Sequence, residues 1–199
     1  MKLVLASKNQ KKLVEMNEIL SHLGIQVCSE AEAGVDVEVE ETGSTFEENS
    51  LLKARAVMEA SGMPAIADDS GLCVDALNGA PGVYSARYGG EGLDDTGRYR
   101  LLLENMRGQT PRTAKFVSVI TCCFPNGDVL SARGECPGTI AFAPMGEGGF
   151  GYDPVFFIPS LKKTFAQLSP EEKNAISHRG KALEAFKVKL EEYLGEDRS

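Results

Sequence analysis

The chain has 199 residues, of which 42% are hydrophobic and 25% charged, and its net charge at pH 7 is −8. That length predicts a single domain over residues 1–199 with a buried core, and the composition is typical of globular proteins. The acidic balance excludes a nucleic-acid partner held by a basic surface, but it leaves small phosphorylated ligands open.

Cysteine and histidine content restricts the kinds of site that the chain can build. Five cysteines occur without any C-x-x-C pair, and the only histidines are His22 and His178. We expect buried thiols in a reducing compartment, and any metal to be a hard cation such as Mg²⁺ held by carboxylates. No apolar run approaches the ~20 residues of a membrane span or resembles a signal peptide, so the sequence predicts a cytoplasmic protein with no membrane partner.

The N-terminal part of the chain predicts strands and helices in alternation. The apolar residues 3–6 predict a short buried strand, and apolar residues at helical spacing after them predict a helix that ends at Gly24. Further strands are expected at 26–29 and at 35–39, where valines alternate with acidic residues.

Two capping boxes predict where later helices begin. Thr45 and Glu48 open a predicted helix over 46–61. Ser169 and Glu172 form the second box, with proline at the first helical position.

More strands are expected between and beyond these helices. The segment PAIA predicts a strand that ends at Ala67, before the turn-like letters DDSG. A helix is predicted over 95–106, two strands flank the hairpin signal Asn126-Gly127, and PVFFI at 154–158 predicts another strand.

The last predicted helix follows Ser177, which is its expected cap. Its apolar face comprises Ala182, Leu183, Phe186 and Leu190. Residues 195–199 are expected to form a polar tail. The whole pattern predicts an α/β protein with a mixed sheet rather than a uniform β-α repeat.

The segment LASKNQKK places polar residues between a strand and a helix. Helix N-termini present free N–H groups and a positive dipole end, which suit a phosphate. Ser7 and Asn9 can cap or bond there, and Lys12 in the first turn opposes the dipole, so its placement favours an anionic ligand. The alternative is a capped surface helix with stray lysines, and the Walker A pattern is absent.

Carboxylates gather at two predicted strand ends. Glu40 and Glu41 follow the alternating strand, and Asp68 and Asp69 follow PAIA. Lys53 lies on the predicted helix between them. These carboxylates can converge on one Mg²⁺, although an ordinary turn and a solvated strand end explain the same letters.

Two C-terminal segments carry candidate base-binding residues. MGEGGFGYDP contains G-x-G-x-x-G, but it precedes a strand instead of opening a helix, so it is not a dinucleotide fingerprint. Phe150 and Asp153 can stack on and hydrogen-bond a base. In EEKNAISHRG, Lys173 comes shortly before a capped helix, and His178 and Arg179 lie in its first turn. Cations in a first turn oppose the helix dipole, which favours a polar ligand over plain surface charge.

Together with EETGSTFEENSLLKA, ADDSGL and GAPGVYSARY, these segments resemble the inosine triphosphate pyrophosphatase family, the non-canonical purine nucleoside triphosphate pyrophosphatases. The motifs run in one order from residue 3 to beyond residue 180, so the likeness covers nearly the whole chain. The departures are mild: Ser7 stands where the family often has threonine, and Glu147 where its glycine motif would have threonine.

The resemblance implies a fold and an activity. The fold is an elongated mixed sheet with flanking helices and two lobes around a central cleft, usually in a homodimer. The activity is the Mg²⁺-dependent hydrolysis of deaminated purine nucleoside triphosphates, such as inosine and xanthosine triphosphates and their deoxy forms, to the monophosphate and pyrophosphate.

The resemblance also implies a role for each matching position. Asp69 would be the general base and a metal ligand, Glu40 or Glu41 would supply the second carboxylate, and Asp68 would support the site. The strand alternation favours Glu40 without excluding Glu41. Lys12 and Lys53 would stabilise the negative charge on the transferring and leaving groups. The residues that would hold the phosphates and sugar are Ser7, Lys8, Asn9, Gln10, Lys11, Lys12, Lys53 and Ser70. Those that would bind the base are Phe150, Gly151, Tyr152, Asp153, Lys173, His178 and Arg179.

Two other functions are alternatives to this interpretation. Maf-type pyrophosphatases share an early LAS, but they continue with an S-P-R-R pattern where this chain has KNQKK. A non-catalytic nucleotide sensor would have lost its acidic ligands, whereas all four carboxylates are present here. Both comparisons favour the purine enzyme.

Overall fold

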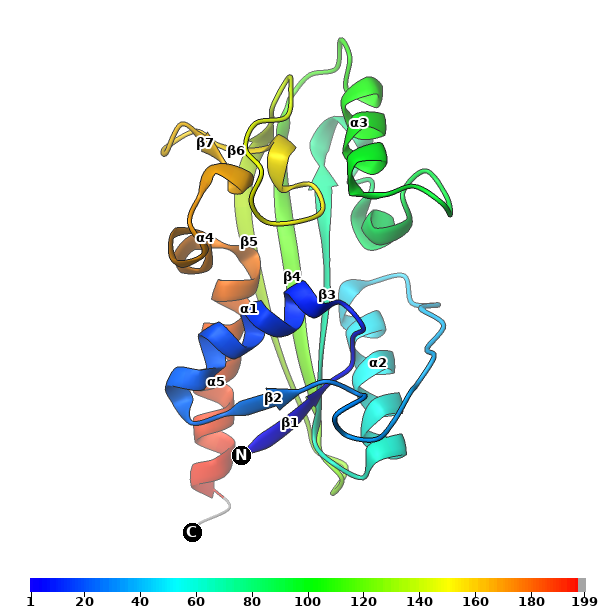
Figure 1. Cartoon of the computed structure of the whole chain (residues 1–199), viewed down its shortest axis with the longest axis vertical. Coiled ribbons are helices and arrows are strands. Elements are labelled where there is room, and N and C mark those ends of the chain that lie inside the picture. Colours follow the sequence, from blue (N-terminus) through cyan, green and yellow to red (C-terminus); the bar gives the residue numbers. More distant parts are fainter. Residues whose placement is uncertain (197–199) are drawn as a thin grey trace. The chain divides into compact units, whose positions relative to one another are not determined.

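The computed structural model describes residues 1–196, in which helices flank a mixed sheet of seven strands (Figure 1). In chain order the elements are β1 Lys2–Leu5, α1 Gln10–Leu20, β2 Gln26–Cys28, α2 Phe46–Ser61, β3 Ala65–Val74, α3 Asp95–Asn105, β4 Thr113–Cys123, β5 Val129–Ile140, β6 Phe156–Ile158, β7 Lys163–Thr164, α4 Pro170–Ile176 and α5 His178–Glu196. The strand order in the sheet is β2-β1-β3-β4-β5-β6-β7. β1 pairs in parallel with β2 and β3, whereas β6 pairs antiparallel with β5 and β7. The predicted α/β class and mixed sheet are therefore confirmed.

The contacts within the chain divide it into two compact units. Unit 1 comprises Met1–Asp69, Ser118–Gly134 and the chain from Arg179 onward. Unit 2 comprises Ser70–Val117 and Glu135–His178. The long strands β3, β4 and β5 each contribute residues to both units.

In unit 1 the sheet is covered by helices on both faces. Successive residues of a strand point to opposite faces. Leu5 and Ile66 therefore share a buried cluster with residues of α1 and α5. Val4, Ala65 and Ala67 point the other way and share a second cluster with residues of α2. The predicted apolar face of the last helix is confirmed, since Ala182, Leu183, Phe186 and Leu190 are buried.

In unit 2 the core is built around aromatic side chains. The Phe116 and Phe156 rings contact edge to face with their centroids 4.5 Å apart, and those of Phe156 and Phe165 lie 4.9 Å apart. The same cluster includes Leu102 in α3 and Met106, which directly follows α3. Within residues 1–196, no helix is both long and apolar enough to cross a membrane.

Most of the predicted helix starts are confirmed by their caps. The Thr45 side chain accepts the backbone N–H of Glu48 at 3.1 Å, but the Glu48 carboxylate accepts the N–H of Ser44 at 2.7 Å instead of completing the box. Ser169 and Glu172 make both bonds of their capping box. Of the predicted polar tail, residues 195 and 196 continue α5, and residues 197–199 lie outside the described residues.

Two predicted strands are wrong in whole or in part. Residues 35–39 form no strand, although their side chains alternate between half-buried and exposed. The N–H of Val37 donates to the carboxylate of Glu30 at 2.9 Å, so a side chain takes the place of a strand partner. In PVFFI only Phe156–Ile158 is a strand, because Pro154 lies in a 3-10 turn and has no N–H to donate.

The strand that was expected to end at Ala67 continues to Val74, and this is the main correction to the predicted fold. β3 runs through Asp68, Asp69, Ser70 and Gly71, so no turn forms there. Within this strand the Asp68 carboxylate is bonded by partners distant in the sequence, as described below, so a local turn is not needed to satisfy it.

Candidate functional site

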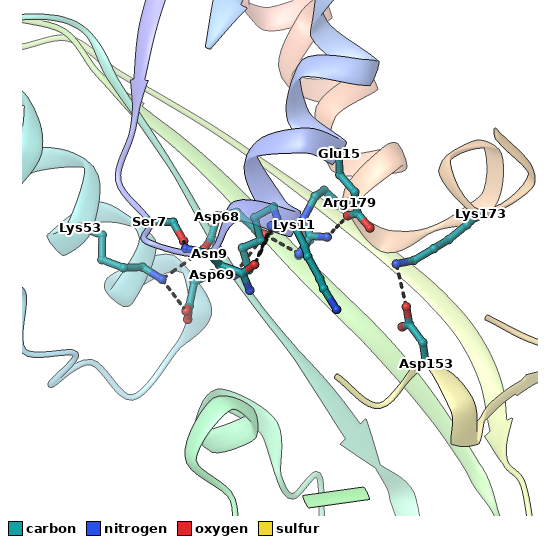
Figure 2. Close-up of polar contacts among 12 residues, drawn as sticks. Ser7, Asn9, Lys11, Glu15, Lys53, Asp68, Asp69, Asp153, Lys173 and Arg179 are labelled. Carbon is teal, nitrogen blue, oxygen red and sulfur yellow. Dashed lines mark hydrogen bonds and ion pairs between the residues drawn. The ribbon is translucent and has the colours of Figure 1, made fainter. Parts of the chain in front are cut away.

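Asp68 is the centre of a buried polar cluster in unit 1. Its side chain is fully buried and shares its face of β3 with Ile66, toward α1 and α5. The Arg179 guanidinium lies 2.7 Å from Oδ2 (Figure 2). The Ser118 hydroxyl donates to Oδ1 at 2.8 Å, and the Lys12 ammonium lies 3.4 Å from Oδ2. A second carboxylate, that of Glu15 in α1, forms an ion pair with Arg179.

These neighbours set the charge of Asp68. Burial alone would raise the pKa of Asp68, but the Arg179 and Lys12 cations hold it well below its usual range. Burial would likewise lower the pKa of Arg179, yet Asp68 and Glu15 raise it above its usual value. Asp68 and Arg179 therefore stabilise each other in the charged form. Their contacts with Lys12 and Glu15 join β3, α1 and the start of α5.

Asp69 points to the opposite face of β3, which it shares with Ala65 and Ala67 and which α2 covers. The Lys53 ammonium, in α2, donates to Asp69 Oδ1 at 3.0 Å and to the Asp68 carbonyl at 3.1 Å. The Glu41 carboxylate lies 3.4 Å from the same ammonium. Two carboxylates and one cation therefore meet beside this face.

The electrostatics of Asp69 differ from those of its neighbour. Burial raises the pKa of Asp69, and the nearby Lys53 offsets this only in part. For Lys53, burial would lower the pKa, but Asp69 and Glu41 raise it above its usual value. The second oxygen of Asp69, Oδ2, is buried and has no hydrogen-bond partner among the described residues. A buried carboxylate oxygen without a protein donor can bind a cation or accept a hydrogen bond from water.

The residues around Asp69 fit a hard divalent cation. Carboxylate oxygens are the ligands that Mg²⁺ prefers, and Mg²⁺ commonly binds one or two of them together with waters and substrate phosphates. Asp69 and Glu41 supply two such groups, although no cluster of three or more potential ligands occurs within residues 1–196. Glu40 is exposed, whereas Glu41 is half-buried beside Lys53, so the geometry favours Glu41 over the residue that strand alternation favoured.

The start of α1 is capped by its own side chains. The Asn9 carbonyl oxygen accepts the N–H groups of Lys11 and Lys12 at 3.0 and 3.3 Å, and the Ser7 hydroxyl accepts the N–H of Asn9 at 3.1 Å. The exposed Lys8 ammonium lies 2.8 Å from the carboxylate of Asp36. Gln10 and Lys11 are exposed, and their phosphate-binding role stays a prediction. A phosphate that bound the N–H groups of Lys11 and Lys12 would have to displace the Asn9 side chain.

Unit 2 holds a second buried ion pair. The Lys173 ammonium in α4 donates to the Asp153 carboxylate at 2.8 Å, and both side chains are buried. The same ammonium lies 4.8 Å from the centre of the Phe150 ring. The structure therefore brings together three of the residues predicted to bind a base.

His178 and Tyr152 are also buried in unit 2. The His178 ring stacks on Phe116 with a centroid distance of 4.6 Å. The Tyr152 hydroxyl donates to the backbone carbonyl of Ser85 at 2.6 Å, and burial raises the pKa of Tyr152. Ser70 is half-buried on β3.

Arg179 is placed differently from the other predicted base-binding residues. It belongs to unit 1, is only 2% exposed, and contacts Asp68 and Glu15. Its base-binding role stays a prediction. Its contacts with Asp68 and Glu15 are those of a residue that orients the Asp68 carboxylate.

Sequence reasoning missed two members of the Asp68 cluster. Glu15 lies one helical turn beyond Lys11 and Lys12, and Ser118 is a polar residue within the apolar run FVSVI. A hydroxyl inside a fully buried strand needs a hydrogen-bond partner. The position of Ser118 in this run could therefore have indicated a buried polar contact.

Comparison with known proteins gives the same family throughout. The model of the Ham1 family matches residues 3–189. A dITP/XTP pyrophosphatase from Desulforamulus reducens is 54% identical over 185 residues, which are 92% of each chain. One from Haemophilus influenzae is 52% identical over 193 residues, 95% of this chain and 98% of the relative.

Solved structures agree with this match. The structure of the Staphylococcus aureus Ham1 protein has a TM-score of 0.87 and 45% identity, covering 97% of this chain and 100% of that one. A HAM1 protein from Coxiella burnetii has a TM-score of 0.88 and 46% identity, covering 96% and 99%. The resemblance inferred from the sequence motifs is therefore confirmed, and the chain belongs to the Ham1 family.

Proposed function

We propose that this chain hydrolyses non-canonical purine nucleoside triphosphates, of the inosine and xanthosine type and their deoxy forms, to the monophosphate and pyrophosphate. The observation that carries the proposal is the group formed by Asp69, Lys53 and Glu41, with a buried Asp69 oxygen that no described residue bonds. The relatives named dITP/XTP pyrophosphatase support the choice of substrate class.

In the proposed reaction, water attacks the α-phosphorus and the bond from that phosphorus to the bridging oxygen breaks. Asp69 accepts a proton from the attacking water, and pyrophosphate leaves with the bridging oxygen. The raised pKa of Asp69 makes it a better proton acceptor than an ordinary aspartate. Lys53 and Lys12 hold positive charge where negative charge develops on the transferred and leaving groups.

Mg²⁺ is the proposed cofactor, and Asp69 and Glu41 would hold it. When bound, it would neutralise phosphate charge and polarise the phosphorus–oxygen bonds. Asp68 would act from the other face of β3 by fixing the strand that carries Asp69.

Base selection is proposed to depend on unit 2. Inosine and xanthosine carry a 6-oxo acceptor where adenosine carries an amino donor. Lys173 and His178 can donate to a 6-oxo group, and Phe150, which is half-buried, offers an aromatic surface for stacking. Buried donors that adenosine leaves unpaired can give a discrimination of about 10⁴ or more.

We also infer a reducing compartment and a homodimer. Among the described residues, the five cysteines form no disulfide with one another, and a reducing compartment keeps thiols in this state. The homodimer rests on the family resemblance, and sedimentation of the purified chain tests it.

The decisive experiment is phosphorus NMR of the products that the chain forms from inosine triphosphate with Mg²⁺, beside parallel reactions with ATP and GTP. The variant Asp69→Asn tests the proposed base, and Glu184→Gln is its matched control, because it neutralises an exposed carboxylate on α5. Solvent labelled with ¹⁸O identifies the attacked phosphorus.

We expect labelled inosine monophosphate and unlabelled pyrophosphate, weak action on ATP and GTP, an inactive Asp69→Asn and an unchanged Glu184→Gln. Orthophosphate as the first product would mean attack at the terminal phosphate and would refute the proposed reaction. Tight binding without turnover of any triphosphate would instead support a nucleotide sensor.

A further inference from the structure

The glycine loop, residues 146–153, is held against the rest of unit 2 by its own backbone. The N–H of Gly148 donates to the carbonyl of Ala166 at 3.0 Å. A Cβ on Gly146 or Gly148 would come within 2.7 or 2.9 Å of the Ala166 backbone, so the approach requires glycine at both positions. This loop carries Phe150 and Asp153, which belong to the proposed base site.

Two further hydrogen bonds tie the end of this loop to the segment after β3. The N–H of Gly151 donates to the Asp95 carboxylate, at the first position of α3, at 2.9 Å. The Tyr152 hydroxyl donates to the carbonyl of Ser85. Ser85 is in turn fixed to β3, because its hydroxyl accepts the N–H of Leu72 at 2.9 Å.

We propose that Asp95 is a positioning residue for base recognition, acting through the N–H of Gly151. The inference rests on the proposed function and deepens it, since it adds a residue to the machinery that selects the base. Gly151 lies between Phe150, whose ring faces the Lys173 ammonium, and Tyr152. Fixing the Gly151 amide therefore fixes the backbone on which both neighbouring side chains are mounted.

The role of Asp95 is separable from helix capping because its neighbour already performs that task. The Asp94 carboxylate accepts the N–H of Gly97 at 2.7 Å and is the N-cap of α3. Asp95 directs its carboxylate to a residue 56 positions away. Asp94 thus caps the helix, whereas Asp95 holds the glycine loop.

The test compares Asp95→Ala and Asp95→Asn with Asp94→Ala as the matched control. We expect Asp95→Ala to raise KM for inosine triphosphate by about three- to tenfold, the effect of losing one charge-assisted bond at an exposed position. Its kcat should stay within about twofold, because the phosphate chemistry does not involve the loop. Asp95→Asn should restore KM most of the way, since an amide oxygen can accept the same N–H. Asp94→Ala should lower the melting temperature and leave KM unchanged.

Hydrogen exchange of peptides spanning 146–153 tests the contact without any substrate. We expect faster exchange of these peptides in Asp95→Ala and not in Asp94→Ala. Unchanged KM and exchange in Asp95→Ala, or an equal rise of KM in Asp94→Ala, would overturn the inference. If the wild type released no pyrophosphate, the proposed function would fail, and exchange alone would then decide whether Asp95 holds the loop.

Discussion

Replacing Asp68 by asparagine would remove the carboxylate that pairs with two cations of unit 1, the buried Arg179 and the half-buried Lys12. The side chain is fully buried, 2.7 Å from the Arg179 guanidinium and 3.4 Å from the Lys12 ammonium. Asparagine has nearly the same shape and can keep the bond from the Ser118 hydroxyl. The substitution therefore isolates the effect of the charge.

The expected loss in the free energy of unfolding follows from the pairing. Removing one partner of a buried ion pair costs about 3–5 kcal/mol, because the other charge stays buried without compensation. Glu15 continues to pair with Arg179, so we expect the lower end, about 3 kcal/mol. For a chain of this size that corresponds to a fall in melting temperature of about 6–12 °C.

The pH dependence of this loss has a definite sign. The pKa of Asp68 in the folded chain lies below its value of about 3.9 in the unfolded chain, despite burial, because of Arg179 and Lys12. A lowered carboxyl pKa contributes stability that is complete above the unfolded value and is lost as the pH falls through the folded value. The difference between wild type and Asp68→Asn should therefore be constant near neutral pH and shrink below about pH 4.

Urea denaturation in the presence of EDTA, at pH 7 and at a series of acidic values, measures both effects. Asp36→Asn is the control, because the Asp36 carboxylate lies 2.8 Å from the Lys8 ammonium but is exposed to solvent, and it should leave stability unchanged. An Asp68→Asn variant as stable as Asp36→Asn would refute the argument. So would a difference from wild type that grows on acidification.

Three further changes test the site. Lys53→Met should lower kcat for pyrophosphate release by about 10²–10³-fold, the usual cost of losing a preorganised charge at the reacting group, and a kcat within about tenfold of wild type would contradict its role. Gly149→Ala, at φ +68°, would bring its Cβ into the Asp153 carboxylate, whereas Gly151→Ala, at φ +61°, would meet no described residue beyond its chain neighbours within 4 Å. Gly149→Ala should therefore lower the melting temperature more, and equal melting temperatures would contradict the steric argument. Chelation by EDTA should abolish turnover of inosine triphosphate and added Mg²⁺ should restore it, whereas turnover that survives chelation would exclude the metal.

The parts of the fold that the sequence predicted well are those set by neighbouring residues. Thr45 and Ser169 mark helix starts because a cap needs only a side chain and an N–H three residues away. Gly24 ends the first helical region in a left-handed conformation for an equally local reason.

The failures have long-range causes. DDSG reads as a turn, yet β3 passes through it because Arg179, 111 residues distant, and Ser118, 50 residues distant, satisfy Asp68. The alternation at 35–39 describes burial correctly but cannot show whether a neighbouring strand exists. That same alternation favoured Glu40 as a metal ligand but could not show that Glu41 is the residue beside Lys53. The choice between the two stays a prediction. A local sequence pattern predicts which side of a segment is buried. Only the folded structure shows which other residues bury it.

Because β3 includes both Asp68 and Asp69, it also determines how this region tolerates mutations. Asp68 and Asp69 are neighbours along the backbone, but strand alternation gives each a separate environment, one toward α1 and α5 and the other toward α2. A mutational scan should therefore find two unrelated phenotypes at adjacent codons, poor folding at the first and a well-folded inactive protein at the second. A single-residue deletion or insertion upstream in β3 would exchange the two environments, and no substitution at either codon alone would repair it.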